Sequence, residues 1–179
     1  MFEKTFEKFG IVYSKFIFRN EKDLQKDLTN FISSAQRILL ILPSDYEDSQ
    51  IACAAFKNLK EKLQNVDLTI IAEGIRAISL TDSFKTKVIR ISEVHINKFF
   101  LPRKVILDRI QESSYDVAID LNLDFFLYSA YICKVVGAKY RIGFTSKYSD
   151  LFFNIQFNFN KAQKPMEIYS QLVEYLKKF

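Results

Sequence analysis

Two short polar loops carry the side chains best suited to chemistry. The first, Ser44–Asp48 (SDYED), and the second, Asn122–Asp124 (NLD), each follow an apolar run. Hydroxyl, carboxylate and amide groups of this kind hydrogen-bond polar ligands, and the candidate binding residues are Ser44, Asp45, Asn122 and Asp124. The same acidic residues are equally suited to capping the helix that follows, and Ser44, Asp45 or Asp48 could be that cap.

Several common catalytic and cofactor motifs are missing. The chain has no G-x-G-x-x-G and no G-x-x-x-x-G-K-S/T, and its four glycines leave little material for a phosphate cradle. A Ser–His–Asp or Cys–His nucleophile would need the single His95, and there is no nucleophile elbow. We therefore expect no dinucleotide or ATP cofactor, no catalytic triad and no His-rich metal site.

The elements that must position the two loops alternate along the chain. The segment Tyr115–Phe144 reads as a strand (Val117–Leu121), a helix (about Phe125–Val136) ended by Gly137, and a strand (Tyr140–Phe144), which together form a right-handed parallel crossover. Further strands are predicted at Arg37–Pro43, Val66–Ala72, Lys87–Ile91 and Leu151–Phe159. Further helices are predicted at about Ser49–Leu63, at Ile75–Leu80, from Pro102 onward, and at Pro165–Phe179. This order predicts an α/β fold, a three-layer, Rossmann-like, doubly wound and mainly parallel sheet.

The winding order selects the candidate site. If the sheet begins in its middle, its direction reverses between the first strand and the Val117–Leu121 strand. Ligands of such sheets bind beyond the carboxyl ends of the strands at this reversal. We therefore expect the loops Ser44–Asp48 and Asn122–Asp124 to face each other.

The N-terminal 36 residues are predicted to be a helical extension, with residues 37–179 as one Rossmann-like domain. Phe2, Phe6, Phe9, Tyr13 and Phe16 recur at helical spacing, opposite Glu3, Lys4, Glu7, Lys8 and Lys15. One interpretation is an interfacial anchor on anionic lipid. The other, which we favour, is that the Met1–Phe16 stripe packs on the domain, on a partner protein or on a second copy. Asn20 is predicted to cap a second helix to about Ser34, with Leu24, Leu28, Phe31 and Ile32 facing inward.

Composition limits the partners and the compartment. The net charge is +5, with basic residues scattered along the chain, which does not indicate a nucleic-acid-binding protein. No run is long enough to span a membrane and no signal-peptide pattern is present. Cys53 and Cys133 lie in apolar helical stretches, so we expect buried free thiols. A cytoplasmic protein, with peripheral contact at the inner face of the membrane as an option, fits these features.

Two stretches resemble the ADP-heptose-using glycosyltransferase family 9, the lipopolysaccharide heptosyltransferases. Gly137-Ala138-Lys139-Tyr140-Arg141-Ile142-Gly143-Phe144 is similar to the family's Gly-Ala-x-x-Arg-Ile-Gly-Phe segment. RILLILPSDYEDSQIACAAFKNLKEK resembles its opening strand, loop and helix, where a Gly-Asp pair supplies the catalytic base. The resemblance implies the N-terminal half of a GT-B fold, a bacterial role in lipopolysaccharide biosynthesis, and Asp48 as general base acting on a sugar hydroxyl, ionised by the helix dipole.

The chain also departs from the family pattern. Glu47 replaces the family's Gly, and Asp120-Leu121-Asn122-Leu123 replaces its Asp-Leu-Gln-Gly, so Asp120 could simply cap the following loop. The donor-binding domain has no counterpart in the sequence. We therefore predict a stand-alone heptosyltransferase-like domain without autonomous catalysis, acting in ligand binding or protein assembly, with a sugar or a phosphate as ligand. Alternatives are the acceptor-side half of a split glycosyltransferase and an anion- or nucleotide-binding module that uses helix N-termini.

Overall fold

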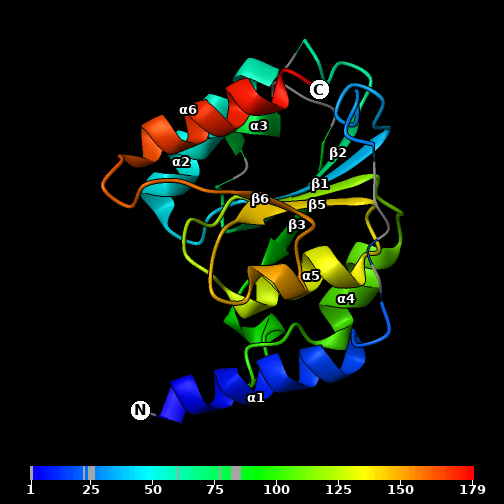
Figure 1. Ribbon diagram of the computed structural model, residues 1–179, viewed down its shortest axis with the longest axis vertical. Helices are drawn as coiled ribbons and strands as arrows, with labels where there is room; N and C mark the ends of the chain where they lie inside the picture. The colour runs from blue at the N-terminus through cyan, green and yellow to red at the C-terminus, as the bar shows by residue number, and fades with distance from the viewer. Residues whose placement is uncertain (1, 22, 24–26, 60, 77, 82–85) are drawn as a thin grey trace.

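Six parallel strands form one sheet, in the order β3-β2-β1-β4-β5-β6 (Figure 1). The computed structural model describes residues 2–21, 23, 27–59, 61–76, 78–81 and 86–179. The strands are β1 Arg37–Ile41, β2 Asp67–Glu73, β3 Thr86–Ile91, β4 Val117–Asp120, β5 Tyr140–Phe144 and β6 Ile155–Phe157. The predicted doubly wound sheet is confirmed, and its direction reverses between β1 and β4 as expected.

Helices cover both faces of the sheet. The helices are α1 Phe2–Ile17, α2 Tyr46–Phe56, α3 Ile78–Thr81, α4 Lys104–Gln111, α5 Leu127–Val135 and α6 Pro165–Leu176, with short 3-10 turns at Lys57–Leu59, Glu93–His95 and Ser149–Leu151. Figure 1 shows α2, α3 and α6 on one face and α4 and α5 on the other. It also shows α1 outside α4 and α5, as an additional layer at one end of the molecule.

Strand β1 explains why helices are needed on both sides. Its sequence RILLI is buried from Ile38 onward. Ile38 and Leu40 point into the core beneath α2 and α6, while Leu39 and Ile41 join the core beneath α5. A strand that is apolar on both faces is stable only as an inner strand of a sheet that is covered on both sides.

The predicted crossover is present as β4, α5 and β5. Gly137 follows α5 with φ +68°, the left-handed conformation expected at a helix C-terminus. Cys133 on α5 and Cys53 on α2 are both buried and neither forms a disulfide, as predicted.

Several predicted boundaries were wrong. No helix follows Asn20 in the described part of 21–34, where residues 29–34 form turns; Leu24 lies outside the described residues. Helix α2 begins three residues before Ser49, because Asp45 caps it. The last strand is limited to Ile155–Phe157, because a 3-10 turn occupies Ser149–Leu151. Pro102 does not begin α4 but forms an isolated β-bridge with Ile96.

Helix α1 packs on the domain with a face that the aromatic stripe did not predict. Gly10, Ile11 and Ser14 are buried against the domain, and Phe18, just after the helix, contacts Tyr131 and Phe152. Of the stripe, Phe6 is half-buried against Phe99, whereas Phe9, Tyr13 and Phe16 are exposed. The side chain of Phe2 lies outside the described residues. Packing of the whole stripe on the domain was therefore wrong, and the boundary at residue 36 stays a prediction.

Gly10 lets α1 approach the 97–101 loop. A Cβ at this position would lie 2.2 Å from the carbonyl oxygen of Phe99. We expect Gly10→Ala to lower the free energy of unfolding by about 1 kcal/mol, because the backbone clash outweighs the gain in helix propensity. Urea unfolding measures the change. Val12→Ala, at an exposed position of the same helix, is the control; equal midpoints for both variants would contradict the packing role of Gly10.

Candidate functional site

The loops after β1 and β4 meet at the carboxyl edge of the sheet, as the sequence predicted. The backbone N–H of Ser44 donates a 2.9 Å hydrogen bond to Oδ1 of Asn122. Asp45 adopts an extended conformation and accepts a hydrogen bond from the backbone N–H of Asp48, which makes it the N-cap of α2. Ser44 and Asn122 thus connect the two loops directly, and Asp48 stands in the first turn of α2.

Asp120 is the centre of a buried network that fixes the second loop. Its carboxylate accepts hydrogen bonds from the backbone N–H of Asn122 at 3.1 Å, from the Asn122 amide at 2.7 Å and from the Ser129 hydroxyl at 2.6 Å. Burial raises the pKa of Asp120 to about 6, although these hydrogen bonds favour the ionised form. The prediction that Asp120 caps the following loop is confirmed.

Three residues that sequence reasoning missed complete the network: Ser129, Tyr128 and Arg76. The hydroxyls of Tyr128 and Ser44 share a hydrogen bond at 2.6 Å. Burial raises the pKa of Tyr128 to about 12, so this phenol stays protonated. Arg76, from the loop after β2, donates to the carbonyl oxygen of Ser44 at 2.8 Å and pairs with Glu73 at 2.9 Å. Loops from three neighbouring strands are therefore held together.

Asp48 lies in a negative environment. Partial burial raises its pKa, and the nearby charges of Asp45, Asp124 and Glu47 raise it further. The helix dipole favours the ionised form of this carboxyl, whereas burial and the three neighbouring carboxylates oppose it. We call Asp45, Glu47, Asp48 and Asp124 the acidic rim. A carboxylate with a raised pKa is a stronger base than an ordinary aspartate.

The predicted site residues divide into two groups. Ser44 and Asn122 belong to the network, and Asn122 is 5% exposed with its amide oxygen and nitrogen both bonded. Asp45 and Asp124 are exposed and Asp48 is half-buried, so the acidic rim faces solvent. The hollow beside Asp120, Asn122 and Asp124 holds only about 10 Å³, which is room for about one water molecule. The direct contact of these residues with a ligand stays a prediction.

Among the described residues, no three His, Cys, Asp or Glu side chains gather as a metal site. None of the described helices is long and apolar enough to cross a bilayer.

Comparison with known proteins bears on the fold of the chain. No protein-family model and no curated protein matches the chain. Solved structures do match. The Escherichia coli heptosyltransferase WaaC with ADP superposes with a TM-score of 0.61 at 18% identity, over 78% of this chain and 46% of that one. E. coli ADP-heptose lipopolysaccharide heptosyltransferase II gives 0.59 at 19% identity, over 77% and 40%. A Veillonella parvula glycosyltransferase of family 9 gives 0.59 at 12%, over 80% and 42%.

The fold of the chain is similar to about half of each of these glycosyltransferases. The chain spans about half the length of these GT-B glycosyltransferases or less. At these identities the likeness establishes the fold alone, so the activity and ligands of the whole enzymes are not carried over with it.

The segment that resembles the family 9 motif stabilises the fold of this domain. Gly137 ends α5, and a Cβ at Gly143 would lie 2.5 Å from the ring of Phe153. Arg141 donates hydrogen bonds to the carbonyl oxygens of Ala138 and Phe152. The Gly137–Phe144 segment therefore explains the fold without contributing a described contact to the acidic rim.

Proposed function

We propose that this family 9-type domain binds the hydroxyl groups of a saccharide at the acidic rim and does not transfer sugar by itself. The acidic rim carries the proposal, because it stands at the sheet reversal where ligands of this fold class bind. Carboxylates accept hydrogen bonds from sugar hydroxyls and repel phosphates. A neutral saccharide therefore fits the rim better than a phosphate or a nucleotide.

Glu47 supports the absence of autonomous transfer. Glu47 adds a further carboxylate beside Asp48, which disfavours a phosphate-bearing donor or acceptor nearby. The adjoining hollow of about 10 Å³ is too small for a sugar ring, so the rim is an open binding surface. One of the similar structures is an ADP-heptose lipopolysaccharide heptosyltransferase, and we therefore propose a bacterial-type saccharide of that class as ligand. We propose a cytoplasmic location, as expected from the sequence.

Replacing Asp48 is expected to weaken saccharide binding. The probe is a neutral heptose oligosaccharide, titrated while the backbone amide signals of 44–48 and 122–124 are followed by NMR. Asp48→Asn removes one charge-assisted acceptor, so we expect an affinity lower by about tenfold. Asp108→Asn, at an exposed position of α4, is the matched control and should change nothing. Shifts confined to other segments, or tighter binding of inorganic phosphate, would refute the proposal.

The raised pKa of Asp48 favours one second candidate, the acceptor-side half of a split transferase. In that case a partner chain supplies the site for the nucleotide sugar, and Asp48 deprotonates the acceptor hydroxyl. Transfer from ADP-heptose would then require the partner and would increase as pH rises through the raised pKa of Asp48. Sugar transfer by this chain alone, abolished by Asp48→Asn, would instead show autonomous catalysis and overturn the first proposal.

A further inference from the structure

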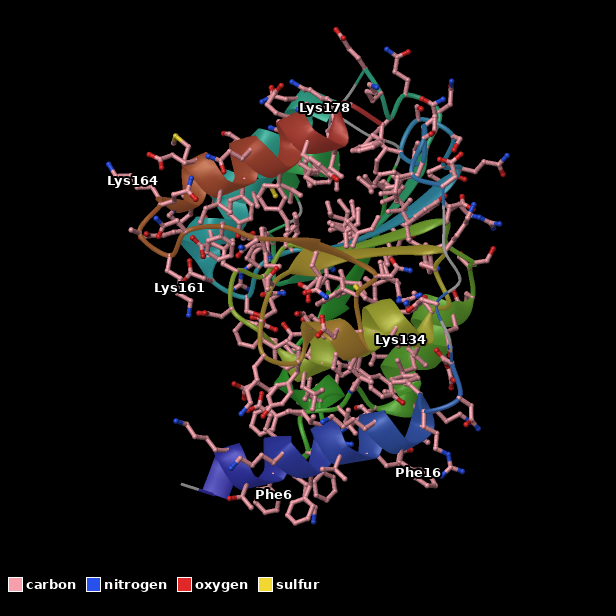
Figure 2. The ribbon with its side chains drawn as sticks, viewed as in Figure 1. Phe6, Phe16, Lys134, Lys161, Lys164 and Lys178 are labelled. Carbon is pink, nitrogen blue, oxygen red and sulfur yellow. The ribbon has the colours of Figure 1, made fainter. Side chains whose placement is uncertain are left out.

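Helix α1 presents an apolar ridge to solvent. Phe9, Tyr13 and Phe16 are spaced four and three residues apart and are 59%, 50% and 59% exposed. Val12 and Ile17 beside them are also exposed. Figure 2 shows Phe16 at the outer margin of the molecule, on the helix that forms its end. We call these five residues the aromatic ridge. Contiguous exposed aromatic surface of this kind marks an interaction site.

The ridge is not the face that holds α1 in place. The packed face consists of Gly10, Ile11 and Ser14, and the Ser14 hydroxyl donates to the carbonyl oxygen of Gly10 at 2.8 Å. A helix at the surface of a domain needs one apolar stripe for its own packing. Because α1 already has such a stripe, the aromatic ridge on its other side requires a different explanation.

Cations border the ridge on both sides. Lys4, Lys8, Lys15 and Arg19 recur at intervals of four and seven residues, so they form a basic strip along one flank, and all four are exposed. On the other flank lies a groove of about 420 Å³, lined by Phe9, Tyr13, Leu101, Leu107 and Lys104 among others. Lys98 lies over the rings of Phe6 and Phe99, and Phe99 also lines this groove. An apolar ridge between two cationic margins is complementary to an anionic lipid surface.

We propose that α1 docks the protein on an anionic membrane surface, with the aromatic ridge among the lipid headgroups and the flanking cations on lipid phosphates. A second copy fits this surface less well, because a two-fold contact between ridges would bring cationic margins together. The sheet lies on the far side of α4 and α5 from α1 (Figure 1). This inference is independent of the proposed saccharide binding.

Vesicle co-sedimentation tests the docking with matched pairs of variants. We expect the chain to sediment with vesicles that contain about 30% phosphatidylglycerol and to bind pure phosphatidylcholine at least about tenfold more weakly. Phe9→Ser/Phe16→Ser should reduce binding by about tenfold or more, whereas Tyr46→Ser/Met166→Ser, at exposed apolar positions elsewhere, should not.

A second pair of variants separates charge from apolar contact. Lys4→Glu/Lys8→Glu/Lys15→Glu should abolish the preference for anionic vesicles. Lys161→Glu/Lys164→Glu/Lys178→Glu makes the same change in net charge at exposed positions away from α1 and should leave binding intact (Figure 2).

Circular dichroism confirms that each variant is folded. Equal sedimentation of the wild type and both α1 variants would overturn the proposal. So would a wild-type dimer in light scattering that ignores vesicles and dissociates on Phe9→Ser/Phe16→Ser, because the ridge would then be covered by a second copy.

Discussion

Asp23→Asn is expected to lower the free energy of unfolding by about 2 kcal/mol at neutral pH. Asp23 is the carboxylate that two nearly buried cations share. Arg141 donates to both of its oxygens at 2.6 and 2.5 Å, and Lys134 lies 3.6 Å away. The two cationic side chains are 6% and 5% exposed. Removing the carboxylate takes this charge partner from Arg141 and leaves Lys134 with Glu21, whose side chain is more exposed. The expected loss is below that of a fully buried pair, because Asp23 itself is 37% exposed.

Glu21→Gln is the matched control for this prediction. Glu21 also contacts Lys134, at 3.3 Å, but its side chain is 54% exposed. Exposed ion pairs contribute little, so we expect a change below about 1 kcal/mol. Chemical denaturation at pH 7 compares the two variants. Equal losses for both would show that Asp23 acts only as one more surface charge.

Asp23 is also expected to make the free energy of unfolding depend on pH in the acid range. Burial raises the pKa of Asp23, but the hydrogen bond and charge of Arg141, with Asn154 and Lys134, outweigh burial and lower it to about 2 from 3.8. Because the folded pKa is depressed, the stabilisation is present above about pH 4 and is lost as pH falls towards 2. Asp23→Asn should remove this part of the acid dependence, which stability measurements between these two pH values would reveal.

The sheet could be predicted because its signals are local. The inner strands β1, β4 and β5 are short apolar runs buried on both faces, and Gly137 marks the end of α5. The connection from β4 through α5 to β5 is short, so this parallel crossover could be predicted. The reversal between β1 and β4 followed from the assumption that the sheet begins in its middle. The resemblance to family 9 rested on the Gly137–Phe144 segment, which the structure uses to build the fold.

The region before β1 could not be predicted from spacing. Phe31 and Ile32 are buried, as the predicted helix required, but they reach the core from turns. Asp27 accepts a 2.8 Å hydrogen bond from the backbone N–H of Thr29, and Asn30 has φ +55°. A side chain that bonds the backbone two residues on competes with helix formation. Phe31 packs on Tyr140 and Phe179, contacts that no local pattern reveals.

The candidate site was predictable only in outline. Its two loops could be placed together because strand ends at the sheet reversal are neighbours. Arg76 and Tyr128 could not be found, since they reach Ser44 from a loop after β2 and from the inner face of α5. The raised pKa of Asp48 also depends on Asp124, which is distant in the sequence.

Asp120→Asn is expected to remove a pH-dependent part of the free energy of unfolding that amounts to about 3 kcal/mol. Burial raises the pKa of Asp120 from 3.8 to about 6. Because the folded pKa is raised, the stabilisation is complete below about pH 4 and is lost as pH rises through 6. Two pKa units correspond to about 3 kcal/mol, and an asparagine has no charge to lose. The free energy of unfolding of the wild type, minus that of Asp120→Asn, should therefore fall by most of this amount between pH 4 and 7.

Taking the difference between the two proteins isolates this one carboxyl, because Asp23 and Asp48 titrate in both. Ser129→Ala provides the second measurement. It removes the 2.6 Å hydrogen bond that favours the ionised form, so the pKa of Asp120 should increase further and the loss of stability should extend to higher pH. A difference that stays constant between pH 4 and 7 would mean that the Asp120 carboxyl is solvated. Asp120 accepts a hydrogen bond from the amide of Asn122, and Asn122 in turn accepts one from the backbone N–H of Ser44, so Asp120 holds the two loops that carry the acidic rim. The expected loss of stability with rising pH would show that ionising this carboxyl in the folded protein costs free energy.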